Sequence, residues 1–125
     1  MFTRDKKDVE GVNWGNGESY RMLTRKDEMG FTVCHTVVYA GTESRLQYRR
    51  HLEACYCISG SGRIMSADKE HTYEVSPGVI YVLEQHDPHF LIADEGEDMH
   101  LVSVFNPPLN GDEKHTLSED GFSQY

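Results

Sequence analysis

Short runs of β-forming residues, each ended by a turn, constrain most strongly how this chain can fold. Val, Thr, Tyr and Ile recur in these runs, and Gly, Pro or polar clusters separate them. The expected strands are residues 31–39, 46–49, 54–58, 63–66, 71–75, 79–83, 90–93 and 100–105. Strands this short, with this spacing of turn residues, are typical of a sandwich or barrel. We therefore expect an all-β fold, with a small jelly-roll-like barrel.

Signals for helices and for domain boundaries are weak. Residues 19–28 are compatible either with one or two helical turns or with a first strand. No internal repeat, low-complexity tract or long linker divides the 125 residues, so we expect a single domain covering 1–125 with its core at about 19–109. After Pro107-Pro108, which ends any strand, residues 110–125 are polar and lack a strand pattern. We expect this C-terminal tail to be flexible and to act as a lid.

Charge and composition exclude several classes of partner. The net charge is −9 and the pI is about 5.1, so the surface repels nucleic acid and anionic membranes. No apolar run approaches the ~20 residues that span a bilayer, and the first ten residues do not resemble a signal peptide. Three cysteines without a disulfide pattern fit reduced thiols. We expect a cytoplasmic protein whose partner is a small molecule.

Alternation along the expected strands brings one set of side chains to a common face. That face carries Glu53, Cys55, Cys57, Tyr81, Leu83, Gln85, His89, Leu91, Leu101, Ser103 and Phe105. A face that mixes Leu and Phe with Glu, Tyr and His is typical of a cavity lining. Burying an isolated carboxylate is costly unless it is paired or coordinates a cation. The pattern therefore indicates a metal site made by Glu53, Tyr81 and His89.

The donor atoms restrict which metal such a site prefers. Two oxygens and one imidazole nitrogen, open on several sides, suit Fe(II) or Mn(II), with Zn(II) as a possible substitute. A free tyrosine titrates near pH ~10, so Tyr81 needs a metal or a hydrogen bond to become a phenolate at neutral pH. Two alternatives remain at this stage. Glu53 could pair with Arg49 or Arg63, and Tyr81 could be an ordinary core aromatic.

The other histidines and the cysteines have simpler explanations. Three histidines are expected on the surface or in hydrogen bonds on strands: His35, His71 and His100. His86 could hydrogen-bond a turn or support the metal site. Cys55 and Cys57 lack the second cysteine pair that a structural zinc site needs, so we expect them to be packing residues on the inner face.

Several sequence blocks resemble a known family. Glu53 followed by Gly60, and then Pro77-Gly78 followed by Tyr81, is similar to the two cupin motifs. More specifically, residues 51–62 (HLEACYCISGSG), 86–89 (HDPH) and 104–111 (VFNPPLNG) resemble ectoine synthases, with further matches at 27–31, 39–43, 77–83 and 119–121. The resemblance implies a cupin-type barrel, a homodimer, and an iron-dependent lyase of compatible-solute synthesis in osmotic stress. Such a lyase closes N-γ-acetyl-L-2,4-diaminobutyrate into ectoine with loss of water.

The resemblance also implies roles for individual residues. It places the iron ligands on Glu53, Tyr81 and His89. Substrate-binding positions are expected at Arg21, Thr36, Leu83, Phe105 and Trp14. Candidates for the catalytic acid and base are Tyr48, His51, Glu113 and His115.

The chain departs from the family pattern in places. Arg45 and Gln47 stand where many cupins have a histidine pair, Ser103 replaces a frequent cysteine, and Gly17 falls on the position of a pocket tryptophan that Trp14 could replace. Two other functions remain open: another metal-dependent cupin enzyme acting on a related small amino-acid derivative, or a non-catalytic cupin that binds a small molecule.

Overall fold

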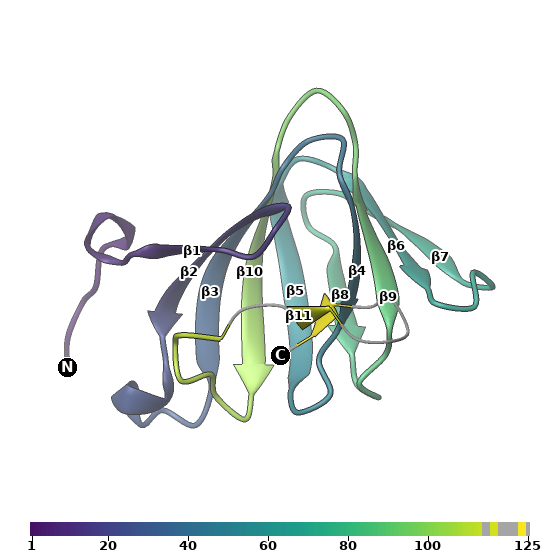
Figure 1. Cartoon of the computed structure of the whole chain (residues 1–125). Helices are drawn as coiled ribbons and strands as arrows, with labels where there is room; N and C mark the ends of the chain where they lie inside the picture. Colours follow the sequence, from purple (N-terminus) through teal and green to yellow (C-terminus); the bar gives the residue numbers. More distant parts are fainter. Residues whose placement is uncertain (114–115, 118–122, 125) are drawn as a thin grey trace.

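Two six-stranded sheets form the molecule (Figure 1). The computed structural model describes residues 1–113, 116–117 and 123–124, the last two pairs by their backbone only. The first sheet contains, in spatial order, β1 (Gly11–Asn13), β2 (Gly17–Leu23), β3 (Thr32–Val38), β10 (Met99–Asn106), β5 (Leu52–Ser59) and β8 (Ile80–Leu83). The second contains β11 (Thr116–Leu117), β12 (Ser123–Gln124), β4 (Glu43–Gln47), β9 (His89–Ala93), β6 (Gly62–Ser66) and β7 (Thr72–Val75). The prediction of an all-β fold is confirmed.

The predicted strands are present with small shifts at their ends, and the N-terminal part resolves the ambiguity at 19–28. Most of that segment lies in β2, and its end forms a short 3-10 helix, η2 (Arg25–Asp27). A first 3-10 helix, η1 (Lys6–Asp8), and the short strand β1 were not predicted. Neither of these helices, the only ones in the described part of the chain, could cross a membrane.

The inner faces of both sheets form one core. All the side chains predicted for the inner face are buried, except that of Gln85. The prediction for Gln85 was wrong because β8 ends at Leu83, so the alternation of the strand does not continue to residue 85. The N–H of Gln85 instead donates to Asp87 in an exposed turn.

The turn between β5 and β6 explains one glycine of the matched block. Gly60 has a φ of 76°, and a Cβ there would lie 2.4 Å from the carbonyl oxygen of Asp98. Only glycine fits this close approach without strain. The turn that leads from β5 in the first sheet to β6 in the second therefore packs closely against the loop that precedes β10.

The C-terminal segment differs from the expectation of a tail without strands. β11 and β12 pair with each other, and β12 pairs in parallel with β4, joining Ser123 to Leu46 and Gln124 to Gln47. This is the one parallel pair among the described strands. The polar sequence gave no alternation to predict it, because β12 adds to the exposed edge of β4. The lid role of the tail stays a prediction.

Candidate active site

The three candidate metal ligands come from both sheets. Glu53 lies on β5 and Tyr81 on β8 of the first sheet, while His89 lies on β9 of the second. Their side chains are almost completely buried, with residue exposures of 5%, 8% and 2%. Burial raises the pKa of the Glu53 carboxyl to about 8, although a hydrogen bond from Cys55 lowers it in part. Burial, then the nearby Cys55 and Glu53, raise the pKa of Tyr81 well above its ordinary value.

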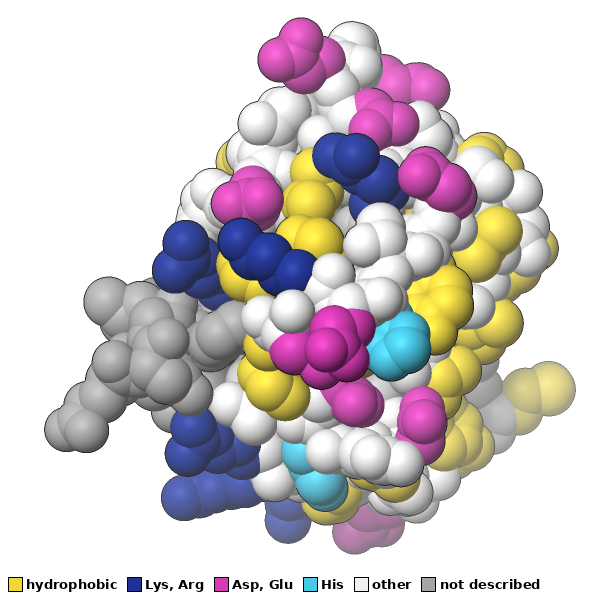
Figure 2. Space-filling view, turned by 90° about the vertical axis from the view of Figure 1, so that its right-hand side faces the viewer, with side chains coloured by type: hydrophobic (Ala, Val, Ile, Leu, Met, Phe, Trp, Pro, Cys, Tyr) yellow, Lys and Arg dark blue, Asp and Glu magenta, His cyan; other side chains and the backbone are white. Residues whose placement is uncertain are grey.

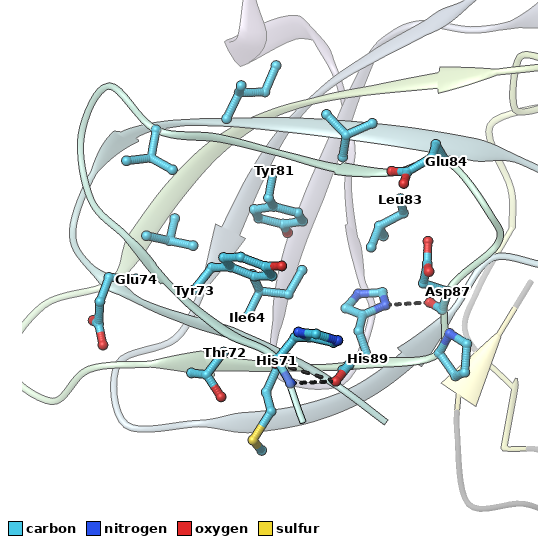
Figure 3. A pocket seen from close by; sticks show the side chains of 17 residues that line it. Ile64, His71, Thr72, Tyr73, Glu74, Tyr81, Leu83, Glu84, Asp87 and His89 are labelled. Atoms are coloured by element: carbon cyan, nitrogen blue, oxygen red, sulfur yellow. Dashed lines mark hydrogen bonds between the residues drawn. The ribbon is translucent and has the colours of Figure 1, made fainter. Parts of the chain in front are cut away.

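The hydrogen bonding of His89 leaves one nitrogen aimed at the interior. Its Nδ1 lies 2.8 Å from the carbonyl oxygen of Asp87, to which it donates (Figure 3). The proton is therefore on Nδ1, and Nε2 carries a free lone pair. Nε2 is buried and has no hydrogen-bond partner among the described residues. Metal-binding histidines commonly donate their other ring N–H to a carbonyl in this way.

The surroundings of Glu53 do not support the alternative of an ion pair. Arg49 donates to Gln47, Arg63 is exposed, and no described residue forms a salt bridge with Glu53. No three His, Cys, Asp or Glu side chains cluster within metal-binding range in the described part of the chain. A buried carboxylate and an unpaired imidazole nitrogen beside a buried phenol fit one cation.

These shifts predict how pH affects the metal-free protein. The folded form keeps a proton on Glu53 up to about pH 8, whereas the unfolded chain loses it near 4.5. The Glu53 contribution to stability is therefore lost as pH rises through 8. His89 changes stability in the opposite direction, because burial lowers its pKa below 6.5. Its contribution to stability increases as pH rises and is complete above pH 6.5. We therefore expect the midpoint of urea unfolding of the metal-free protein to fall as pH rises from 6.5 to 8. Glu53→Gln should remove the part of this decrease that comes from Glu53.

The exposed Glu84 offers a matched control for that experiment. Glu84→Gln changes the same charge outside the core and should keep the decline between pH 6.5 and 8. An equal slope in wild type and Glu53→Gln would contradict the assignment of the buried proton to Glu53.

A cavity of about 650 Å³ opens between the edge strands β7 and β8. Figure 3 shows Tyr81, Leu83 and His89 along its inner side and His71 and Tyr73 nearer the opening. Figure 2 shows the side of the molecule on the right of Figure 1, where hydrophobic, acidic and basic side chains alternate and imidazoles reach the surface. Tyr81 and His89 both line the cavity between β7 and β8.

A second, inner cavity lies on the other side of Tyr81. It measures only about 20 Å³ and is lined by Trp14, Ser19, Thr36, Leu46, Tyr48, Glu53, Cys55, Tyr81, Leu91, Leu101, Ser103 and Phe105. The structure thus brings together four of the residues implied as substrate-binding or catalytic: Trp14, Thr36, Tyr48 and Phe105. The rings of Tyr48 and Phe105 meet edge to face at 5.2 Å. Leu83 lines the larger cavity instead.

Arg21 and the catalytic candidate Glu113 contact the start of the tail. The buried Arg21 donates from Nε to Ser19 and from Nη1 to the carbonyl of Gly111, at 3.2 and 3.0 Å. Glu113 accepts from the N–H groups of Asn110 and Gly111 at 2.7 and 2.8 Å. Burial alone would raise the pKa of Glu113, but these N–H groups and the Arg21 charge lower it below its ordinary value.

His51 is placed by two contacts. It is buried, its Nδ1 donates to the carbonyl of Pro107 at 2.7 Å, and its ring meets Phe105 edge to face. This puts His51 behind the wall of the inner cavity. His115 lies outside the described residues.

His86 supports two of these candidates through their backbone. Its Nδ1 lies 2.9 Å from the carbonyl oxygen of Tyr48 and 3.1 Å from that of His51. His86 has a φ of 54°, and its ring reaches the connection of residues 48–51 between β4 and β5. Both contacts are hydrogen bonds to a turn, the first of the two roles open for His86, and support of the metal site stays a prediction. The motif of residues 86–89 was the only sequence signal for it.

The departures from the cupin pattern have structural explanations. Arg45 is exposed and lies over the ring of Phe90, and Gln47 donates to the carbonyl of His86, while Leu46 between them is buried. Positions 45 and 47 therefore do not reach the interior. A Cβ added at Gly17 would lie 1.8 Å from the carbonyl oxygen of Val37 and 3.0 Å from the ring of Trp14. No side chain therefore fits at this position.

Comparison with known proteins identifies the family. The model of the family described as "Ectoine synthase" matches residues 2–124. The chain belongs to the ectoine synthase family. An L-ectoine synthase of Desulfatibacillum aliphaticivorans is 46% identical over 114 residues, covering 91% of this chain and 84% of that protein. The L-ectoine synthase of Vibrio parahaemolyticus is 45% identical over 107 residues, covering 86% of this chain and 80% of that one.

Solved structures agree with this assignment. The crystal structure of ectoine synthase from P. lautus superimposes with a TM-score of 0.82 at 37% identity, covering 89% of this chain and 81% of that chain. The polyketide cyclase RemF from Streptomyces resistomycificus has a TM-score of 0.72 at 20% identity, covering 98% and 90%, which shows a shared fold only. The prediction of an enzyme of the ectoine synthase family with a cupin fold is confirmed.

Proposed function

We propose that this chain closes N-γ-acetyl-L-2,4-diaminobutyrate into ectoine with loss of water. The observation that carries the proposal is the buried set of Glu53, Tyr81 and His89, with a free Nε2, inside a chain that matches the ectoine synthase family over residues 2–124. We further propose that the enzyme works in the cytoplasm and that its product serves as a compatible solute in osmotic stress.

The three buried donors would hold Fe(II), or Mn(II) or Zn(II) in its place. When bound, such an ion supplies Lewis-acid polarisation of the acetamide carbonyl. The remaining catalytic work falls to the side chains around it. They must curl a flexible substrate so that its α-amine meets the acetamide carbon, which is an effect of orientation.

The walls of the inner cavity suit that task. Trp14, Tyr48 and Phe105 offer flat apolar surfaces against which a short chain can fold. The guanidinium of Arg21 suits the carboxylate of an amino acid. At about 20 Å³ the inner cavity holds about one water molecule, so the substrate enters only when the walls, or the contact between Arg21 and Gly111, move apart.

Ring closure requires two proton transfers. The amine loses both of its protons as the new carbon–nitrogen double bond forms, and the carbonyl oxygen leaves with them as water. Tyr48, His51, Glu113 and His115 are the candidate acid and base groups. Burial alone would raise the pKa of Glu113, but the N–H groups of Asn110 and Gly111 and the charge of Arg21 lower it, which keeps Glu113 ionised but makes it a weaker proton acceptor than an ordinary carboxylate.

Incubating the purified protein with Fe(II) and N-γ-acetyl-L-2,4-diaminobutyrate tests the proposal. We expect ectoine to form in amounts that rise with enzyme and time, measured by proton NMR of the quenched reaction. L-2,4-diaminobutyrate without the acetyl group is the matched control substrate, because it lacks the carbonyl carbon that the α-amine attacks and should give no ectoine. Absence of ectoine from metal-loaded, folded protein would refute the reaction.

We also propose that residues 1–125 form one domain and that two copies form a homodimer. Strands from both ends of the chain, β1 and β12, join the two sheets. The outer face of the first sheet exposes a continuous apolar surface across neighbouring strands, because Tyr56 pairs with Ile80 and Ala54 pairs with both Val82 and Val104. Exposed apolar patches of this kind commonly mark protein interfaces.

A charge in the centre of this patch should separate the copies. Val82→Lys places an ammonium group where the proposed partner would bury it, so we expect a monomer by size-exclusion chromatography with light scattering. Tyr73→Lys is the control, since Tyr73 is exposed on β7 outside the patch. A dimer that survives Val82→Lys unchanged would contradict this interface.

A further inference from the structure

A row of paired, inward-facing residues crosses the first sheet and ends at Tyr81. Cys34 on β3 pairs with Ser103 on β10, Ser103 pairs with Cys55 on β5, and Cys55 pairs with Tyr81 on β8. All four side chains are buried. Glu53 shares the inner face of β5 two residues from Cys55. The thiol of Cys55 therefore lies between the two proposed oxygen ligands and the hydroxyl of Ser103.

Hydrogen bonds fix this thiol from one side. Its Sγ lies 3.3 Å from Oγ of Ser103, and that hydroxyl lies 2.9 Å from Oγ1 of Thr36. These contacts join three adjacent strands, β5, β10 and β3, through side chains alone. Because rigid strands carry all three groups, Sγ has little freedom to move.

The same thiol contacts the candidate ligands on its other side. Cys55 is the register partner of Tyr81 across β5 and β8, and it lines the inner cavity together with Glu53, Tyr81 and Ser103. A thiol can donate once and accept on sulfur. With Ser103 as donor to sulfur, the S–H is left to donate to Glu53.

Cys57 provides an internal contrast on the same strand. It faces the same core and is equally buried, but its Sγ lies 3.5 Å from the carbonyl oxygen of Ser59 and 3.6 Å from that of Gly60. Its hydrogen bonds go to the turn after β5 rather than to a candidate ligand. The expectation that both cysteines only pack the core therefore fits Cys57 better than Cys55.

We propose that Cys55 is a positioning residue of the metal centre, whose thiol, fixed by Ser103 and Thr36, holds Glu53 and Tyr81 in their metal-binding orientation. The proposal rests on the proposed function to the extent that it takes Glu53 and Tyr81 as ligands. Groups that orient metal ligands in this way typically change metal affinity by about 10–100-fold when removed.

Metal affinity measured without turnover tests the proposal. Zn(II) binding to metal-free protein, by competition with a chromophoric chelator, should weaken about 10–100-fold in Cys55→Ala. Cys57→Ala removes an equally buried thiol and should bind as wild type does. Cys55→Ser keeps a donor and should recover much of the affinity. Equal affinities for Cys55→Ala and Cys57→Ala would overturn the proposal.

A second variant covers the case in which Cys55→Ala does not fold. Ser103→Ala leaves the thiol in place but frees it from β10, so we expect a smaller loss of affinity in the same direction. Wild-type affinity in Ser103→Ala would then overturn the proposal.

A spectroscopic measurement separates positioning from loss of packing. At saturating Co(II), the visible absorption bands should shift in Cys55→Ala, because the ligand geometry changes, and should stay unchanged in Cys57→Ala. Identical spectra for wild type and Cys55→Ala would refute the role. These readouts need no ectoine formation, so wild-type protein that binds metal but makes no ectoine refutes only the reaction.

Discussion

Removing any one of the three proposed ligand side chains is expected to reduce metal retention and turnover together, by about 100-fold or more. The variants are Glu53→Gln, Tyr81→Phe and His89→Ala. Each removes a donor from a core that offers few replacements among the described residues, so the cation would keep an open position in an apolar interior. Bound metal after gel filtration, measured by mass spectrometry, should fall in parallel with the rate of ectoine formation.

The larger cavity supplies a matched control for each variant. Glu84, Tyr73 and His71 line it with the same three functional groups, but they are exposed and nearer solvent. Glu84→Gln, Tyr73→Phe and His71→Ala should therefore keep wild-type metal content. Full metal occupancy in all three ligand variants would show that the cation binds elsewhere.

Truncation after Gly111 is expected to keep the metal and to lower turnover by about 100-fold or more, as misplacing a reacting group by 1 Å can do. The cut removes Glu113, His115 and the parallel pairing of β12 with β4. If the tail closes over bound substrate, its loss admits bulk water to a reaction that releases water. Single-turnover rates and metal content of the shortened protein provide the measurement.

The position of the cut preserves the barrel. Leu109 is fully buried, its N–H donates to Thr32 at 2.8 Å, and its carbonyl accepts from the N–H of Arg25 at 2.7 Å. These contacts remain after truncation. A shortened protein that turns over at the full-length rate would exclude the lid. If turnover falls, the single variants Glu113→Gln and His115→Ala show which role each side chain has. A higher KM indicates a role in binding substrate, and a lower kcat indicates a role in the chemical step.

Alternation predicted most of the interior because a strand has a period of two residues and one buried face. Glu53 and Tyr81 could be selected on this basis because they lie inside β5 and β8, and His89 could be selected because it is in phase with β9, which begins at this residue. Gln85 could not be judged, because the end of β8 at Leu83 depends on the turn that Asp87 stabilises. The strand β12 was not predictable for a related reason: it pairs with an edge and buries no alternating face of its own.

The support of the site depends on contacts between distant parts of the sequence. Ser103 is 48 residues from Cys55, and His86 is 38 residues from Tyr48. Local pattern carries no information about which hydroxyl meets which thiol, or which carbonyl an imidazole reaches. The sequence thus indicated candidate ligands, whereas the groups packed around them could be found only from the register between strands.

The placement of β10 has a consequence for how the protein is made. β10 is the last long strand to be synthesised, yet it lies between β3 and β5 in the middle of the first sheet. Until residues 99–106 leave the ribosome, β5 and its Glu53 have no neighbour on that side. Sheets built from such distant segments form slowly, because long loops must close before the strands pair. The three proposed metal donors are therefore synthesised before the strand that fixes β5 in the sheet, so we expect any metal to be bound only after β10 has been made.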